Sequence, residues 1–141
     1  MAKAEIEETL SVDRDKFFQA VVGYEQYPKF VEGCTKVEVD RSKPPVSRVT
    51  YHVSMIKDIS YTLDHTEDAA AGKVTWKLVK SDFLKKNIGE WTIQSAGPGK
   101  TKVKYSIEIE FNIPVPGLIL NRLVKSSLPS MIKAFEKKSR A

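Results

Sequence analysis

Cysteine and histidine are scarce in this sequence, and their scarcity excludes several kinds of site. Cys34 is the only cysteine, and the histidines are His52 and His65. One cysteine cannot form an internal disulfide or a multi-cysteine metal site, and two separated histidines do not favour zinc. We therefore expect no metal ion and no cofactor. We interpret Cys34 as a buried structural thiol rather than a nucleophile.

Long hydrophobic runs are also missing. No apolar segment approaches the roughly 20 residues that a membrane-spanning helix needs. Residues 1–10, MAKAEIEETL, carry acidic side chains where a secretion signal would carry its apolar core. Residues 96–99, Ala-Gly-Pro-Gly, are typical of a hairpin turn and not of a phosphate-binding loop, because proline lacks a donor. We expect a cytoplasmic protein.

Acidic residues are nearly absent from the C-terminal segment, residues 117–141. The segment holds six basic residues against the single acidic Glu136, so it carries the whole net charge of +5. Two interpretations are open. The cations form a solvated face at the negative end of a helix dipole, or they contact an anionic membrane surface or nucleic acid. The residues that would make such a contact are Lys133, Lys137, Lys138 and Arg140.

The chain does have the size and composition of one folded domain. Its 141 residues are 41% hydrophobic and 29% charged, as in ordinary globular proteins. A chain of this length can bury a core without disulfides or metals. It has no internal repeat and no low-complexity linker. We expect a single domain over residues 1–141.

The pattern of apolar residues predicts strands, with two short helices near the start. Residues 4–10 alternate with a period of two. Asp13 is suited to cap a helix that ends at Gly23. A shorter second helix follows, with Pro28 in its first turn. Over residues 34–113 the period is again two, with turn signals at hairpin spacing, which predicts one antiparallel sheet with a buried face and a wet face.

The residues of the buried face follow from the alternation. The opposite face is mostly polar. The expected buried residues are Val37, Val39, Val49, Tyr51, Val53, Met55, Ile59, Tyr61, Leu63, His65, Val74, Trp76, Leu78, Trp91, Ile93, Val103, Tyr105, Ile107, Ile109 and Phe111.

Apolar residues in the C-terminal segment recur at steps of four, four, three and four, the spacing of one helical face. These residues are Leu120, Val124, Leu128, Met131 and Phe135. About seven strands spaced by about 4.8 Å make a sheet roughly 30 Å wide, whereas a helix is about 10 to 12 Å across. The sheet must therefore curl around the helix, which leaves an interior that is not fully filled. Pro129 should kink or break this helix.

This order of elements resembles the START-like superfamily, which includes polyketide cyclase/dehydrase-like and coenzyme Q-binding proteins. Particular matches are Asp13 with Phe17 and Phe18, the turn at residues 27–30, and the helix entry at residues 116–118. The resemblance implies an α+β helix-grip fold, in which a curved seven-stranded antiparallel sheet wraps around a long C-terminal helix. It also implies a pocket between sheet and helix for a lipid, isoprenoid quinone, sterol or polyketide.

The pocket implied by the resemblance would be lined from both layers. We expect its ligand-binding residues to be Val49, Tyr51, Val53, Tyr61, Leu63, His65, Trp76, Leu78, Trp91, Ile93, Val103, Tyr105, Ile107, Leu120, Val124, Leu128 and Met131.

Four polar side chains stand on the expected buried face, namely Tyr51, Tyr61, His65 and Tyr105. They would orient the polar end of a ligand, or they reach the rim of the sheet and meet water. His65 is also a candidate general acid or base. Asp64 cannot form a dyad with it, because adjacent strand residues point to opposite faces.

A further candidate is the loop at residues 81–86. Phe83 and Leu84 stand beside Lys85 and Lys86, a combination that would let the tip dip into a bilayer while the lysines meet headgroups. Alternatively, the two apolar side chains fold back or extend a strand. A membrane contact would place the protein peripherally at the inner membrane face.

Three functions follow from these features. The preferred one is non-covalent binding of a hydrophobic molecule, with transport or presentation of it. The second is a cyclase or dehydratase that acts on a polyketide-like chain through the same polar groups, although no catalytic residue is assigned. The third is a ribosome-associated protein whose basic helix meets RNA. Both a monomer and a homodimer are compatible with the sequence.

Overall fold

The computed structural model describes residues 2–31, 33–54, 58–112, 114, 116, 117 and 128–140. Within these ranges the strands form one seven-stranded sheet in the order β1-β7-β6-β5-β4-β3-β2. The strands are β1 (Ala2–Leu10), β2 (Cys34–Lys43), β3 (Val46–Ser54), β4 (Asp58–Asp68), β5 (Lys73–Ser81), β6 (Leu84–Ser95) and β7 (Thr101–Phe111). The helices are α1 (Arg14–Val22), the 3-10 helix η1 (Tyr24–Lys29) and α3 (Leu128–Arg140). The predicted helix-grip fold is confirmed.

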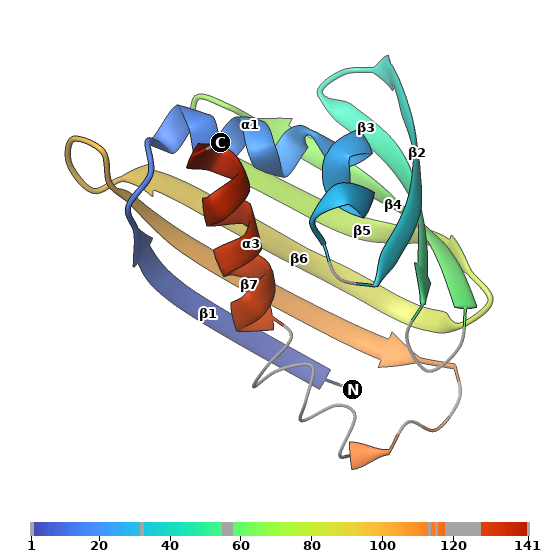
Figure 1. Ribbon diagram of the computed structural model, residues 1–141. Coiled ribbons are helices and arrows are strands. Elements are labelled where there is room, and N and C mark those ends of the chain that lie inside the picture. The colour runs from blue at the N-terminus through green and yellow to red at the C-terminus, as the bar shows by residue number, and fades with distance from the viewer. Residues whose placement is uncertain are drawn as a thin grey trace.

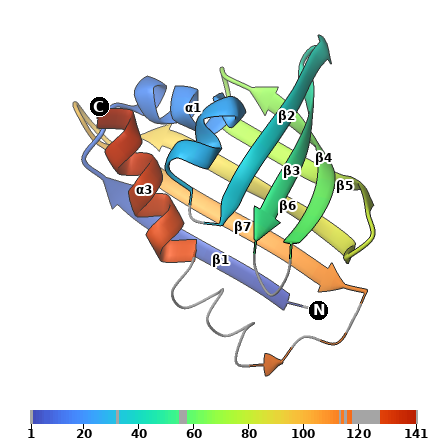
Figure 2. The same cartoon turned by 45° about the vertical axis from the view of Figure 1, so that its right-hand side comes forward.

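The described helices share one face of the sheet, which we call the inner face. Helix α3 lies across this face, and α1 and η1 lie towards one end of it, which we call the α1 end (Figure 1). Strands β2 and β3 curl out of the plane of β1, β7 and β6 (Figure 2). The sheet therefore surrounds the helical layer instead of lying flat beneath it.

The strand register gathers the aromatic side chains on the inner face. Tyr51 of β3 lies opposite Tyr61 of β4. His65 of β4 lies opposite Trp76 of β5, which in turn lies opposite Gly89 of β6. Residues directly opposite each other in an antiparallel pair point to the same face and can touch. The alternation along each strand and the register between strands thus place these aromatic rings next to one another on the inner face.

Gly89 leaves the space that the Trp76 ring occupies. A Cβ atom at Gly89 would lie 2.2 Å from the Trp76 Cζ2 atom and 2.5 Å from the Ser106 carbonyl oxygen. Both distances are shorter than real contacts of a Cβ atom. A glycine at this position therefore lets the indole lie against the backbone of β6.

The expected position of Pro28 is wrong. Helix η1 begins at Tyr24, so Pro28 is the fifth of its six residues instead of part of its first turn. The early start lets Tyr24 and Tyr27 share one buried face, since residues three apart superimpose in a 3-10 helix. Pro129 is the second residue of α3, and the helix kink predicted there concerns residues 118–127, which lie outside the described residues.

Candidate functional site

An aromatic cluster closes the α1 end of the inner face. We define it as Phe17, Tyr27, Phe30, Trp91 and Phe135. The Phe135 ring of α3 lies 5.4 Å from the Trp91 ring and 5.1 Å from the Tyr27 ring, in both cases edge to face. Phe17 and Phe135 are 0% and 1% exposed. Such ring contacts stabilise the packing of α1, η1 and α3 on the sheet.

Beyond the aromatic cluster, apolar side chains remain partly exposed. This half-buried band consists of Val53, Tyr61, Leu78, Ile107 and Met131. The first three also pack against a second, small buried cluster farther along the sheet. That cluster consists of Ile59, Phe83, Leu84 and Ile109. The side chains of the band are therefore only partly covered by packing among the described residues, although buried groups lie on both sides of the band.

The structure places the expected ligand-binding residues in three groups. The half-buried ones form the band. Leu120 and Val124 lie outside the described residues. The buried ones are Val49, Tyr51, Leu63, His65, Trp76, Trp91, Ile93, Val103, Tyr105 and Leu128. The inward direction of the described residues agrees with the alternation, and their contact with a ligand stays a prediction.

His65 and Tyr51 form a hydrogen-bonded pair on the inner face. The Nε2 atom of His65 lies 2.8 Å from the hydroxyl oxygen of Tyr51. The Nδ1 atom is buried and has no hydrogen-bond partner in the described part of the chain. The imidazole lies against the Tyr24 ring at 4.7 Å and the Trp76 ring at 5.7 Å. Of the four expected polar residues, only His65 and Tyr51 are therefore hydrogen-bonded to each other.

The inner polar groups keep one protonation state near neutral pH. Burial lowers the pKa of His65 to about 3, so its imidazole is neutral. Burial also raises the pKa of Tyr51 and of Tyr105 above the ordinary value, so both phenols keep their protons. Asp64 instead bonds to Arg48 on the outer face, at 2.9 Å and 3.1 Å. His65, Tyr51 and Tyr105 are therefore neutral hydrogen-bonding groups, and Asp64 forms no acid–base dyad with His65.

Glu67 was not among the expected inner residues. Its Oε2 atom accepts hydrogen bonds from the Tyr24 hydroxyl at 2.6 Å and from the Ser47 hydroxyl at 3.0 Å. The Arg41 guanidinium lies 5.7 Å from the centre of the Tyr24 ring. Glu67 stands two residues after His65 in the same strand, so the alternation already contained the signal for its direction.

Asn87 is a second inner residue that the sequence did not bring out. It is 4% exposed, and its side-chain oxygen accepts a hydrogen bond from the Trp76 indole at 2.9 Å. Through this bond the buried indole N–H of Trp76 has a hydrogen-bond acceptor. Asn87 shares the parity of Trp91, four residues later, but its polar type suggested the outer face.

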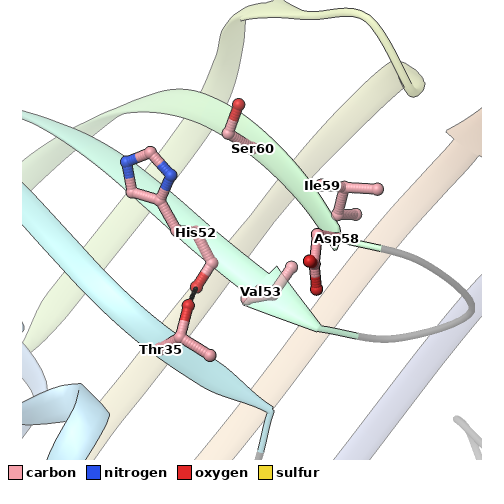
Figure 3. Close-up of a pocket in the computed structure, with 6 residues that line it drawn as sticks. All are labelled: Thr35, His52, Val53, Asp58, Ile59 and Ser60. Carbon is pink, nitrogen blue, oxygen red and sulfur yellow. Dashed lines mark hydrogen bonds between the residues drawn. The ribbon is translucent and has the colours of Figure 1, made fainter.

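A hollow of about 320 Å³ lies at the rim of the sheet, where β3 ends and β4 begins. It is lined by Thr35, His52, Val53, Asp58, Ile59 and Ser60 (Figure 3). The Thr35 hydroxyl donates a hydrogen bond to the His52 carbonyl oxygen at 3.1 Å. Val53 is the only lining residue among the expected binding residues. This rim hollow therefore differs from the expected pocket beneath α3, which stays a prediction.

Of the two interpretations of residues 81–86, the structure contradicts the exposed apolar tip and agrees with the alternative, in which the two apolar side chains fold back or extend a strand. Phe83 and Leu84 are 4% and 3% exposed. The backbone N–H groups of both donate to the Ser81 hydroxyl oxygen at 3.1 Å, and β6 begins at Leu84. Lys85 and Lys86 pair with Glu110 and Glu108. No helix in the described ranges is long and apolar enough to cross a membrane.

Three basic residues of α3 differ from the paired lysines on the outer face of the sheet. Outer lysines such as Lys102 and Lys104 form ion pairs across strands. On α3, Lys133, Lys137 and Lys138 are exposed and form no ion pair with any residue that the structure describes. The fourth expected cation, Arg140, forms an ion pair with Glu136, and its Nη1 atom lies 3.7 Å from the Oε2 atom of Glu136. These three lysines of α3 therefore lack an ion-pair partner within the described protein, as do some lysines elsewhere, such as Lys16 and Lys80.

The curved sheet around α3 and the apolar inner face define a START-like helix-grip protein. The Zhui aromatase/cyclase from a Streptomyces species has this fold, with a TM-score of 0.85 and 13% identity over 98% of this chain and 93% of that chain. A START superfamily protein from Mycobacterium smegmatis has a TM-score of 0.84 and 17% identity over 99% of this chain and 98% of that chain. At these identities the likeness shows the fold alone.

The chain belongs to the family described as polyketide cyclase / dehydrase and lipid transport, whose model matches residues 10–136. The ribosome association toxin RatA of Escherichia coli is 25% identical over 122 residues, which cover 86% of this chain and 76% of that protein. The persistence and stress-resistance toxin PasT of another Escherichia coli strain matches with the same identity and coverage. The family description names both catalysis and transport.

Proposed function

We propose that this domain binds a hydrophobic molecule without covalent chemistry and carries or presents it. The observation that carries the proposal is the half-buried band, which adjoins the His65–Tyr51 pair. An apolar ligand on the band would remove partly exposed side chains from water, which is worth roughly 25 cal/mol per Å². A few placed polar groups on an apolar wall are what fix the orientation of such a ligand. The transport part of the family description supports this function.

The protonation states on the inner face favour binding over catalysis. A general acid or base works best when its pKa lies near the operating pH. The pKa of His65 lies at about 3, and the pKa of Tyr51 is raised. Neither group exchanges a proton readily near neutral pH. A cyclase or dehydratase activity that uses these groups is therefore the second candidate.

A ribosome-associated function is favoured by a different surface. Lys133, Lys137 and Lys138 have no ion-pair partner within the described ranges, and a relative at 25% identity is named a ribosome association toxin. RNA would supply the missing negative charges, and its binding would weaken as salt rises. These lysines are exposed, so such a contact would not compete with a ligand on the inner face.

Native mass spectrometry of the purified protein, followed by organic extraction, tests the binding function. We expect an adduct that survives gentle ionisation, is lost on denaturation and is recovered in the organic phase. Protein that carries no adduct and takes up no hydrophobic fluorescent probe would contradict the proposal. Sedimentation with ribosomes at low and high salt tests the ribosome-associated function separately.

A further inference from the structure

The His65–Tyr51 pair contains one hydrogen-bond donor that the described protein does not use. A neutral imidazole carries one N–H and a phenol one O–H, and the contact of 2.8 Å uses one of the two. If Tyr51 donates to Nε2, the imidazole hydrogen lies on Nδ1, which has no partner in the described residues. If Nε2 donates to Tyr51, the phenol hydrogen is left over. Each tautomer leaves one donor.

The pair stands directly behind the half-buried band. Tyr61 of the band stacks on Tyr51, with ring centres 5.4 Å apart and planes inclined by 27°. His65 is 5% exposed. Leaving a buried donor without a partner costs free energy, so buried donors in proteins normally meet a protein group, water or a ligand. A molecule on the band would lie against Tyr61, next to the Tyr51 ring of the pair.

The charges near the pair disfavour an anionic ligand. Glu67 is the carboxylate on the same strand face, and its negative charge would repel a second anion. Arg41 lies over the Tyr24 ring and is paired with Glu25, so it is already neutralised. The buried polar and charged side chains among the described residues include no lysine and no arginine. A buried carboxylate or phosphate would lack a counter-ion here.

We propose that the ligand presents an uncharged oxygen acceptor, such as a ketone or another carbonyl group on a hydrophobic body, to the His65–Tyr51 pair. The pair donates its unused hydrogen to this oxygen. The inference rests on the proposed binding function and narrows the ligand class. Neutral carbonyl compounds are favoured over fatty acids and phospholipids, whose charged head would need a cation.

Three probes with the same carbon chain test the ligand class on the wild-type protein. They are methyl octyl ketone, decanoic acid and decane, each competing with a hydrophobic fluorescent probe near neutral pH. After correction for the more favourable transfer of decane from water to an apolar solvent, one net hydrogen bond should make the ketone bind about two- to tenfold more tightly than decane. The carboxylate should bind more weakly than the ketone. If decane competes as well as the ketone after this correction, the carbonyl inference is overturned while the binding function stands; if none of the three competes, both are overturned.

A double variant tests the two residues. Tyr51→Phe with His65→Phe removes both donors, whereas either single change leaves one. The control is Thr50→Val with Thr62→Val, which deletes a side-chain hydrogen bond of 2.9 Å on the outer face of the same two strands. We expect the preference for ketone over decane to vanish in the double variant and to survive in the control. A preference that survives in a folded double variant would overturn the assignment.

Infrared spectroscopy keeps the test independent of how well the double variant folds. A carbonyl group that accepts a hydrogen bond absorbs at lower frequency than the same group in an alkane. We expect the carbonyl band of bound methyl octyl ketone to shift down in the wild type and in the control variant. A band at the alkane position in the wild-type complex would show that no donor reaches the ketone, and would overturn the inference.

Discussion

Val103 and Ile107 stand four residues apart on the inner face of β7, yet Val103 is fully buried and Ile107 is half-buried. Val103 lies at the α1 end, which the aromatic cluster covers. Ile107 lies in the half-buried band, beyond those rings. The difference shows that packing closes the α1 end of the inner face, whereas the half-buried band, with buried side chains on both sides of it, keeps apolar surface partly exposed. Regions with fewer buried contacts are the ones from which binding surfaces are drawn.

The largest expected effect is a difference in the free energy of unfolding between a variant of the aromatic cluster and a variant of the half-buried band. Phe135→Ala removes the ring that joins α3 to Tyr27 and Trp91, and it should lower the free energy of unfolding by about 3–5 kcal/mol. Met131→Ala, one helical turn earlier in the half-buried band, should cost less than about 2 kcal/mol. Urea unfolding measures both. Equal losses would mean that the band is packed as tightly as the α1 end.

A second pair of variants tests whether the band has space that the α1 end lacks. Ile107→Trp should fold and abolish uptake of a hydrophobic fluorescent probe, because the indole would occupy the ligand site. Val103→Trp should cost about 1–3 kcal/mol or more, because it overfills a closed core. Val53→Trp should behave like Ile107→Trp. Circular dichroism reports folding, and unchanged uptake by both folded band variants would contradict the site.

His65 lies between the two regions, and its titration measures how well this part of the inner face is closed to water. Its pKa is about 3 in the folded protein against an ordinary value of 6.5. Between these pH values the unfolded chain binds more protons, so the free energy of unfolding falls as pH decreases, by a slope approaching about 1.4 kcal/mol per pH unit. The stability is fully present above pH 6.5.

The variant His65→Phe should lose this part of the pH dependence. Unfolding by urea from neutral pH down to about pH 4 compares the two proteins, and the carboxylates, which titrate alike in both, cancel in the difference. A wild-type curve as flat as that of the variant would indicate that His65 is protonated in the folded protein and therefore not enclosed.

The smallest effect on stability is expected on the outer side of α3. Changing Lys133, Lys137 and Lys138 together to glutamine should alter the free energy of unfolding by no more than about 0.5 kcal/mol. If these lysines meet an anionic surface, the triple variant should lose salt-dependent binding to ribosomes or to anionic liposomes. Ribosome binding without liposome binding would identify RNA as the partner.

The matched control changes three paired lysines of the outer sheet face, Lys73, Lys102 and Lys104, to glutamine. It removes the same charge but leaves α3 intact. Loss of binding in both triple variants would mean that net charge alone attracts the partner. If the wild type binds neither surface at low salt, the lysines of α3 form a solvated face.

The direction of most inner residues could be predicted from the alternation. Trp76, Trp91 and Tyr105 point inwards because a strand alternates its faces strictly, whatever lies above it. Glu67 and Asn87 obey the same alternation, but their polar types suggested the wet face. Partners from other elements make their inward positions favourable, namely the Tyr24 and Ser47 hydroxyls for Glu67 and the Trp76 indole for Asn87.

The error at Phe83 and Leu84 has a different cause. A loop over residues 81–86 would be long enough to expose two apolar side chains, but β5 continues to Ser81 and β6 starts at Leu84. The short connection turns the Phe83 ring towards Phe111 of β7, 5.4 Å away. The local sequence pattern predicts neither that β5 ends at Ser81 nor that β7 extends to Phe111, since both strand ends depend on pairing between strands.

The sequence by itself determined the strand alternation, the apolar face of the last helix and the gathering of positive charge at the C-terminal segment, because each depends only on neighbours along the chain. The tertiary structure decided which inward residues are closed off and which stay half-buried. It also decided that the His65–Tyr51 pair has a donor to spare. These properties arise where Phe135 meets Trp91 and where β3 pairs with β4, and such contacts between distant residues leave no periodic signal in a sequence.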